Sequence, residues 1–141
     1  MLAAILAAAC GYRYLLSVPG HGYSNRLKSL LACGSVVLHV PYPAEEWFVP
    51  LLTPGVDYVR LASVKDIVPA LLALRRNASA AKSIAAAALA FAQRHLQFDS
   101  AVEYTADVLA AHAAVQGYSN RRFCLRPRCQ PWSTHAGETG A

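Results

Sequence analysis

The stretch YRYLLSVPGHGYSNRLKSLLACGSVVLHV, residues 12–40, decides the fold of this chain. It opens with an apolar and aromatic run, passes through a turn that contains Gly20 and Gly22, and continues with the spacing of a helix. We expect Ser24 to cap this helix and Gly34 to end it, before a second apolar run begins. The stretch therefore predicts a strand–helix–strand unit.

The turn between the first strand and the helix is the candidate ligand site. Glycines let a backbone approach a ligand closely, and the first free N–H groups of a helix attract anions. Arg26 and Lys28 add side-chain charge in the first turns of the same helix, so a diphosphate is the natural ligand. The spacing differs from the GxGxxG dinucleotide fingerprint, whose third glycine would fall at Asn25.

Length and composition indicate a single domain. The chain has 141 residues, of which 55% are hydrophobic, enough to form a core. The opening MLAAILAAAC lacks the positive start and cleavage site of a signal peptide and is too short to span a bilayer. We expect it to form a core helix before the first strand, and we expect no transmembrane segment elsewhere.

The net charge of +5 does not indicate a nucleic-acid partner. Residues 117–141 contribute +3 of it and the remaining residues only +2. This terminal segment is rich in Arg, Pro, Ser, Thr and Gly and has no interleaved aromatic platform, so we expect a disordered tail after a domain at 1–116.

The four cysteines are too few and too scattered for a disulfide scaffold. Cys124 and Cys129, with only His135 nearby, match a zinc site poorly, which leaves a local disulfide or two free thiols. Cys10 has no assigned role, and we expect Cys33 to be a small core residue at the end of the first helix.

The segment after residue 40 predicts a short helix and a third strand. The helix should start near Ala44 and hold Glu45 and Glu46 in its first turn, where the helix dipole favours carboxylates. A turn at Pro54 and Gly55 then leads into VDYVRL, whose alternating faces predict a strand.

Three helices should complete the domain. Ser63 and Asp66 form a capping box for a helix that starts near Asp66, and Asn77 starts a second helix. The second helix has one apolar face, on which His95 is a core or boundary histidine; that face holds Ile84, Ala88, Phe91 and His95. A last helix should run from Asp99 to about Gln116 with exposed apolar positions.

Asn77-Ala78-Ser79 also has the pattern of an N-glycosylation acceptor, which would suit a lumenal protein. The same residues fit a helix cap, and the sequence leaves both interpretations open.

Two runs of the sequence resemble a known family. The run YRYLLSVxGxGYSNRLKxLLxCGSVV, followed by EEWFVPLLxPGVDYV, is similar to the C-terminal half of the CAP10-like glycosyltransferases, which include Rumi-type protein O-glucosyltransferases and fungal capsule-associated xylosyltransferases. The resemblance covers residues 11–116 and implies a GT-B enzyme with two Rossmann-like domains. This chain would be its α/β C-terminal half, a parallel sheet flanked by helices with a helical C-terminal part.

The resemblance implies a site for a UDP-sugar donor. The predicted phosphate-binding residues are Gly20, Gly22, Tyr23, Ser24, Arg26 and Lys28. Glu46 matches the family's glutamate before two aromatics and would bind the donor's ribose or sugar hydroxyls. No DxD metal motif is present, so we expect no metal or other cofactor, with cationic side chains acting instead. Asp57 and Pro19 depart from the family, where His and Asp are common.

The implied reaction is inverting transfer of glucose or xylose from UDP-glucose or UDP-xylose to a hydroxyl of a protein or glycan. The family's catalytic aspartate lies upstream of this chain, which should therefore be part of a longer enzyme of the endoplasmic reticulum or Golgi lumen. We assign no catalytic residue here, since His21 is better interpreted as a loop histidine. The alternative function is a non-catalytic fragment that binds a nucleotide or a protein.

Overall fold

A three-stranded parallel sheet flanked by helices forms the centre of the computed structural model, which describes residues 8–20 and 24–117. The strands lie in sequence order as β1 (Tyr14–Ser17), β2 (Val36–His39) and β3 (Val59–Arg60). The predicted α/β class with a parallel sheet is therefore confirmed.

The predicted strand–helix–strand unit is present, with a shorter helix than expected. Helix α2 (Arg26–Leu31) connects β1 to β2 and has only six residues. Its N-cap is Asn25, without a side-chain cap bond, so the expectation that Ser24 caps the helix is wrong. Gly34 has a φ of +66°, a conformation that favours glycine, and it turns the chain into β2 as predicted.

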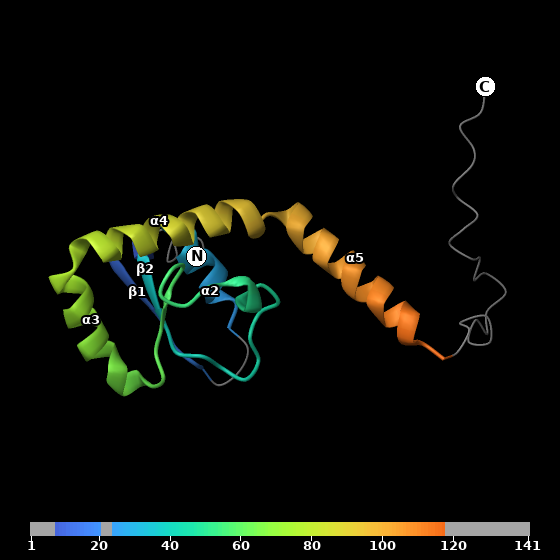
Figure 1. Ribbon diagram of the computed structural model, residues 1–141, viewed down its shortest axis with the longest axis horizontal. Helices are drawn as coiled ribbons and strands as arrows, with labels where there is room; N and C mark the ends of the chain where they lie inside the picture. Colours follow the sequence, from blue (N-terminus) through green and yellow to red (C-terminus); the bar gives the residue numbers. More distant parts are fainter. Residues whose placement is uncertain (1–7, 21–23, 118–141) are drawn as a thin grey trace, which may run out of the picture. The chain divides into compact units, whose positions relative to one another are not determined.

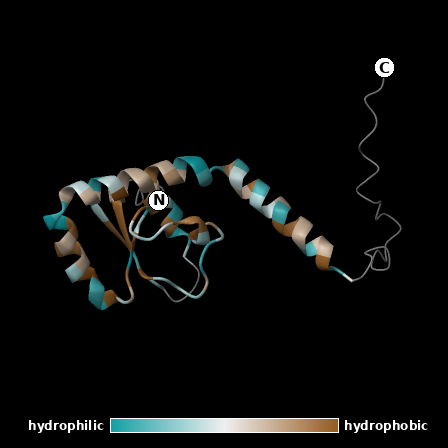
Figure 2. Ribbon diagram, in the orientation of Figure 1, coloured by the Kyte–Doolittle hydropathy of each residue, from teal (hydrophilic) through white to brown (hydrophobic). Residues whose placement is uncertain are grey.

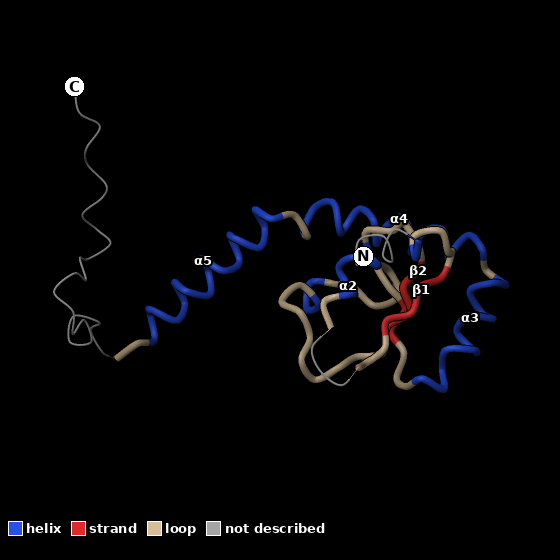
Figure 3. Tube along the Cα trace, turned by 180° about the vertical axis from the view of Figure 1, so that it is seen from behind, coloured by secondary structure: helices blue, strands red, loops and turns tan. Residues whose placement is uncertain are grey.

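The sheet is buried on both faces because β2 is buried along its whole length. One face packs against α2 and the second half of α4 (Ala78–His95), and the other packs against α3 (Ile67–Arg76) and the first half of α4. Figure 1 shows α4 running across one end of β1 and β2 with α2 and α3 on either side, and Figure 2 shows the hydrophobic colour of the strands between them. The same arrangement is seen from behind in Figure 3.

The segment between β2 and β3 differs from the prediction. No helix starts near Ala44; a single 3-10 turn, η1 (Val49–Leu51), forms instead, because prolines at 41, 43 and 50 disrupt regular helical hydrogen bonding. The third strand is only two residues long. The first residues of the expected strand VDYVRL belong instead to a turn. In this turn the Thr53 N–H donates to the Asp57 carboxylate at 2.8 Å, and Gly55 has a φ of +82°.

The predicted helix starts in the second half of the chain are confirmed. Ser63 and Asp66 form a full capping box at η2 (Val64–Asp66), directly before α3. The Asn77 side chain caps α4. On the predicted apolar face of α4, the residues Ile84, Ala88 and Phe91 are buried, and the His95 ring lies 4.8 Å from that of Phe91. His95 is thus a boundary histidine.

The chain divides into two compact units, Met1–Glu103 and Tyr104–Ala141. Helix α5 (Phe98–Val115) has no buried residue and carries hydrophilic and hydrophobic residues along its length (Figure 2). Among the described helices, none has the length and apolar character to cross a membrane. Cys124 and Cys129, for which a local disulfide or two free thiols was left open, lie outside the described residues, as do the predicted tail and most of the predicted opening helix.

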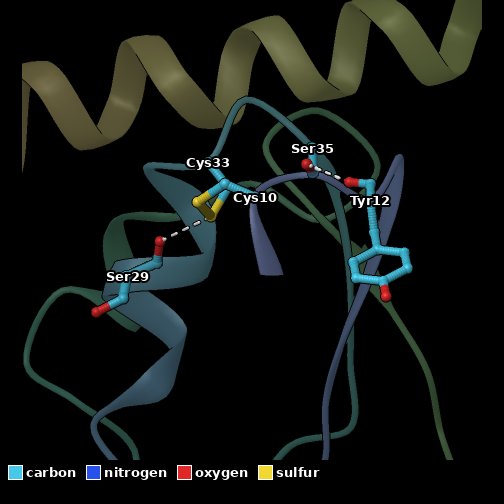
Figure 4. The surroundings of a disulfide bond; sticks show 5 residues. All are labelled: Cys10, Tyr12, Ser29, Cys33 and Ser35. Atoms are coloured by element: carbon cyan, nitrogen blue, oxygen red, sulfur yellow. Dashed lines mark hydrogen bonds between the residues drawn. A yellow bond between two sulfur atoms is a disulfide. The ribbon is translucent and has the colours of Figure 1, made fainter. Parts of the chain in front are cut away.

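A disulfide joins Cys10 to Cys33, which the sequence analysis did not predict. Cys33 does pack partly buried against the core, as expected, but its sulfur is bonded (Figure 4). The same Sγ atom lies 3.5 Å from the carbonyl oxygen of Ser29, and close by the Ser35 hydroxyl donates to the Tyr12 carbonyl at 2.7 Å. The bond thus links the start of β1 to the end of α2. The two cysteines are 23 residues apart, and nothing in that spacing predicts that they pair.

Candidate functional site

A pocket opens at the carboxyl ends of β1 and β2, the edge where parallel α/β sheets commonly bind ligands. Its volume is about 30 Å³, so it can receive one small group of a ligand and not a whole nucleotide-sugar. The residues that line it come from the end of β1, the following turn, α2, the end of β2 and the segment before η1: Ser17, Val18, Pro19, Gly20, Ser24, Leu27, His39, Val40, Tyr42, Ala44, Glu45, Glu46 and Val49.

Arg26 braces the turn beside this pocket. Its Nε donates to Ser24 Oγ at 3.0 Å, and its Nη2 donates to the Val18 carbonyl at 3.0 Å. A guanidinium has five N–H donors, so three are left without a hydrogen-bond partner among the described residues. The residue is exposed, and a planar cation with free donors suits a phosphate well.

The described residues among the other predicted phosphate-binding positions also lie beside the pocket. Gly20 lines the pocket, and a Cβ added there would meet no atom within 4 Å. Ser24 accepts a bond from Arg26 and can still donate its own hydroxyl hydrogen. Gly22 and Tyr23 lie outside the described residues, as does His21. Because α2 is only six residues long, we base the anion site on Arg26 and not on a helix dipole.

Lys28 and Glu46 form an ion pair across the pocket wall. Lys28 Nζ lies 3.2 Å from Glu46 Oε2; the lysine side chain is 45% exposed and the glutamate only 5%. Lys28 is one of the residues that the sequence analysis expected to bind phosphate. In the structure its ammonium neutralises a buried carboxylate.

The second oxygen of Glu46 is chemically unsatisfied. Oε1 is buried and has no hydrogen-bond partner within residues 8–20 and 24–117. An unpaired buried acceptor costs about 1–3 kcal/mol, so it favours a ligand that brings an O–H or N–H donor. Glu46 lines the pocket, but Oε1 itself is buried, so a ligand's hydroxyl would reach it only after the pocket wall shifts.

His39 is a pocket residue that the sequence analysis missed. It ends β2, is 7% exposed, and has Nδ1 3.1 Å from Ser17 Oγ. Its Nε2 is buried and has no hydrogen-bond partner in the described part of the chain; Glu45 Oε1, at 3.6 Å, is beyond hydrogen-bond reach. The sequence did contain a signal for His39, because it lies near the end of an apolar run that predicts a buried parallel strand. Ligands commonly bind at that end of such strands.

The charge state of His39 depends on its burial. Burial lowers its pKa below the ordinary 6.5, and the carboxylate of Glu45 opposes this shift in part. Glu45 is thus close enough to act on the histidine, although it remains exposed. The ring of Tyr58 meets His39 edge-on at 5.8 Å, and burial raises the pKa of this tyrosine. Burial thus favours the neutral form of the imidazole, against the attraction of Glu45.

The structure brings the two predicted halves of the site together. Arg26 holds the turn that forms one wall, and Glu46, 20 residues later, forms the other. No group of three His, Cys, Asp or Glu side chains that could hold a metal occurs among the described residues. The side chains in place can offer positive charge, a hydroxyl and hydrogen-bond acceptors.

Comparisons with known proteins identify the family of this chain. The family model described as glycosyl transferase family 90 matches residues 3–123. Protein O-glucosyltransferase 1 of Homo sapiens is 33% identical over 114 residues, which cover 80% of this chain and 29% of that protein. O-glucosyltransferase rumi of Drosophila melanogaster is 31% identical over 112 residues, 77% of this chain and 27% of that protein. The chain thus spans about three tenths of the length of these relatives.

Proposed function

Because the chain belongs to glycosyl transferase family 90, we propose that it is the donor-binding part of an inverting glycosyltransferase that moves glucose or xylose from a UDP-sugar to a hydroxyl of a protein or glycan. The chain would form part of the C-terminal half of a GT-B enzyme. The observation that carries the proposal lies at one sheet edge: within the described residues, a cation there has donors left over and a buried carboxylate oxygen has no donor.

Arg26 would bind the diphosphate. Breaking the anomeric C–O bond leaves negative charge on the phosphate oxygen of UDP, and a fixed cation there stabilises the leaving group. The bond to the Val18 carbonyl already holds the guanidinium in place, so little side-chain freedom is lost on binding. Gly20 would allow the phosphates to approach the backbone, and Ser24 would add a hydroxyl donor.

Glu46 would accept a hydroxyl of the donor's ribose or sugar. Its Oε1 lacks a donor among the described residues, while Lys28 Nζ donates to the other oxygen and holds it in place. The pocket's small volume suits one such group, while the rest of the nucleotide-sugar would lie across the exposed turn. The catalytic base and much of the acceptor site would come from the part of the enzyme outside this chain.

The cysteine chemistry supports the proposal of a lumenal location. Disulfides such as Cys10–Cys33 form and persist in oxidising compartments and are rare in the cytosol. This supports the endoplasmic reticulum or Golgi lumen as the place where the protein acts.

Calorimetric titration with UDP tests the proposal. We expect Arg26→Ala to weaken binding by about 1.5–3 kcal/mol, or about 10- to 150-fold in Kd, the size of a charge-assisted hydrogen bond. Arg94→Ala is the matched control, because Arg94 is exposed on α4 and makes no bond among the described residues. Glu46→Gln should weaken UDP-glucose binding as well. A folded chain without affinity for UDP would contradict donor binding and favour the protein-binding alternative.

A further inference from the structure

The turn between α3 and α4 carries a sequence motif to which the proposed function assigns no role. Asn77-Ala78-Ser79 is the only Asn-X-Ser/Thr triplet in the 141-residue sequence. All three residues are exposed, and they lie where α3 ends and α4 begins (Figure 1). An acceptor asparagine needs a surface position of this kind, because the attached glycan is bulky and must remain in water.

The helix cap and a glycan are compatible at Asn77. Its Oδ1 accepts the Ala80 N–H at 3.0 Å, which caps α4. Its Nδ2, the atom that a glycan is joined to, has no hydrogen-bond partner among the described residues. A glycosylated amide keeps its carbonyl oxygen, so the cap is preserved after modification. The two interpretations of this triplet therefore do not exclude each other.

The turn lies at the edge of the sheet opposite the candidate donor pocket. Ala78 shares a surface hollow with Arg13, Gly34 and Val36, at the amino-terminal ends of β1 and β2. The donor pocket opens at the carboxyl ends of the same strands. A glycan on Asn77 would therefore leave the pocket open.

We propose that Asn77 is an N-glycosylation site, an inference that rests on the lumenal location proposed above. The Nδ2 atom forms a bond to the anomeric carbon of the first sugar of a polyprenyl-diphosphate-linked oligosaccharide and loses one proton. The bond from that carbon to the diphosphate oxygen breaks, and the lipid diphosphate leaves with the electron pair. A membrane-bound oligosaccharyltransferase of the lumen supplies the catalysis as the chain enters, before α4 has folded.

The test is expression of the full chain behind a cleavable secretion leader in a glycosylating eukaryotic cell. Intact mass and peptide mapping are measured before and after peptide-N-glycosidase, on both secreted and lumenally retained material. We expect a glycan on the peptide that contains Asn77, and we expect the glycosidase to remove it and convert that asparagine to aspartate.

Two variants separate the glycan from the cap. Ser79→Ala removes the acceptor pattern and keeps the Asn77 cap, whereas Asn77→Asp removes Nδ2 and keeps a capping oxygen. Both should lose the glycan completely and fold with the helix content of the deglycosylated parent chain. An unmodified Asn77 in material whose Cys10–Cys33 bond has formed would overturn the inference, since that bond reports passage through the lumen. UDP titration of the same material tests the proposed function separately.

Discussion

Replacing Lys28 by methionine should lower the free energy of unfolding by about 1–3 kcal/mol, because it leaves the buried Glu46 carboxylate without its ammonium partner. The two charges lie 3.2 Å apart. At that distance they attract by about 1 kcal/mol in bulk water and about 5 kcal/mol at an effective dielectric constant of 20. The lysine side chain is 45% exposed and therefore screened, so we expect a coupling energy of about 1–2 kcal/mol.

A double-mutant cycle measures this coupling. Urea unfolding followed by circular dichroism would compare the parent chain with Lys28→Met, Glu46→Gln and the double variant. Lys82→Met is the matched control, because Lys82 is exposed on α4 and has no ion pair among the described residues. It should change the free energy of unfolding by less than about 0.5 kcal/mol.

Two results would refute the reasoning. A coupling energy below about 0.5 kcal/mol would mean that Lys28 and Glu46 act independently, in spite of the 3.2 Å contact. A loss of stability from Lys82→Met as large as that from Lys28→Met would mean that the effect is not specific to the ion pair with Glu46.

Two further predictions concern pH and redox state. The pKa of His39 is lowered on folding, so the unfolded chain binds more protons, and stability should fall as the pH drops below about 6.5 towards the folded pKa. His39→Gln should flatten that dependence in urea midpoints measured from neutral to mildly acidic pH, and an unchanged slope would contradict the assignment. The Cys10→Ser/Cys33→Ser variant should lose about 3 kcal/mol of stability in urea unfolding, since the bond closes a loop across 23 residues. A loss below about 1 kcal/mol would contradict the expected constraint.

Much of the fold was predictable because it depends on near neighbours in the chain. The two apolar runs around α2, the left-handed Gly34 and the Ser63–Asp66 capping box are each local patterns, and each is confirmed. The failures are also local. A helix was expected from Ala44, where prolines limit the backbone, and Ser24 was expected to cap α2, but its hydroxyl accepts a bond from Arg26 instead.

The candidate site was predictable only in its outline. A glycine turn followed by a cation pointed to the carboxyl end of β1, and a glutamate after β2 pointed to the neighbouring strand end. Parallel pairing brings those two ends together. The ion pair of Lys28 was not predictable, because it depends on which side chains the fold brings together. His39 was missed, although its position at the end of β2 offered a signal.

The sequence by itself determined the periodicity, the turns and the helix starts, because these follow from the steric and hydrogen-bonding preferences of a few adjacent residues. Only the tertiary structure decided the Lys28–Glu46 ion pair, the burial that lowers the pKa of His39 and the Cys10–Cys33 bond. Their partners lie far apart along the chain or depend on burial, and both the strength of a charge interaction and the cost of an unpaired polar atom depend on how much water is excluded around it.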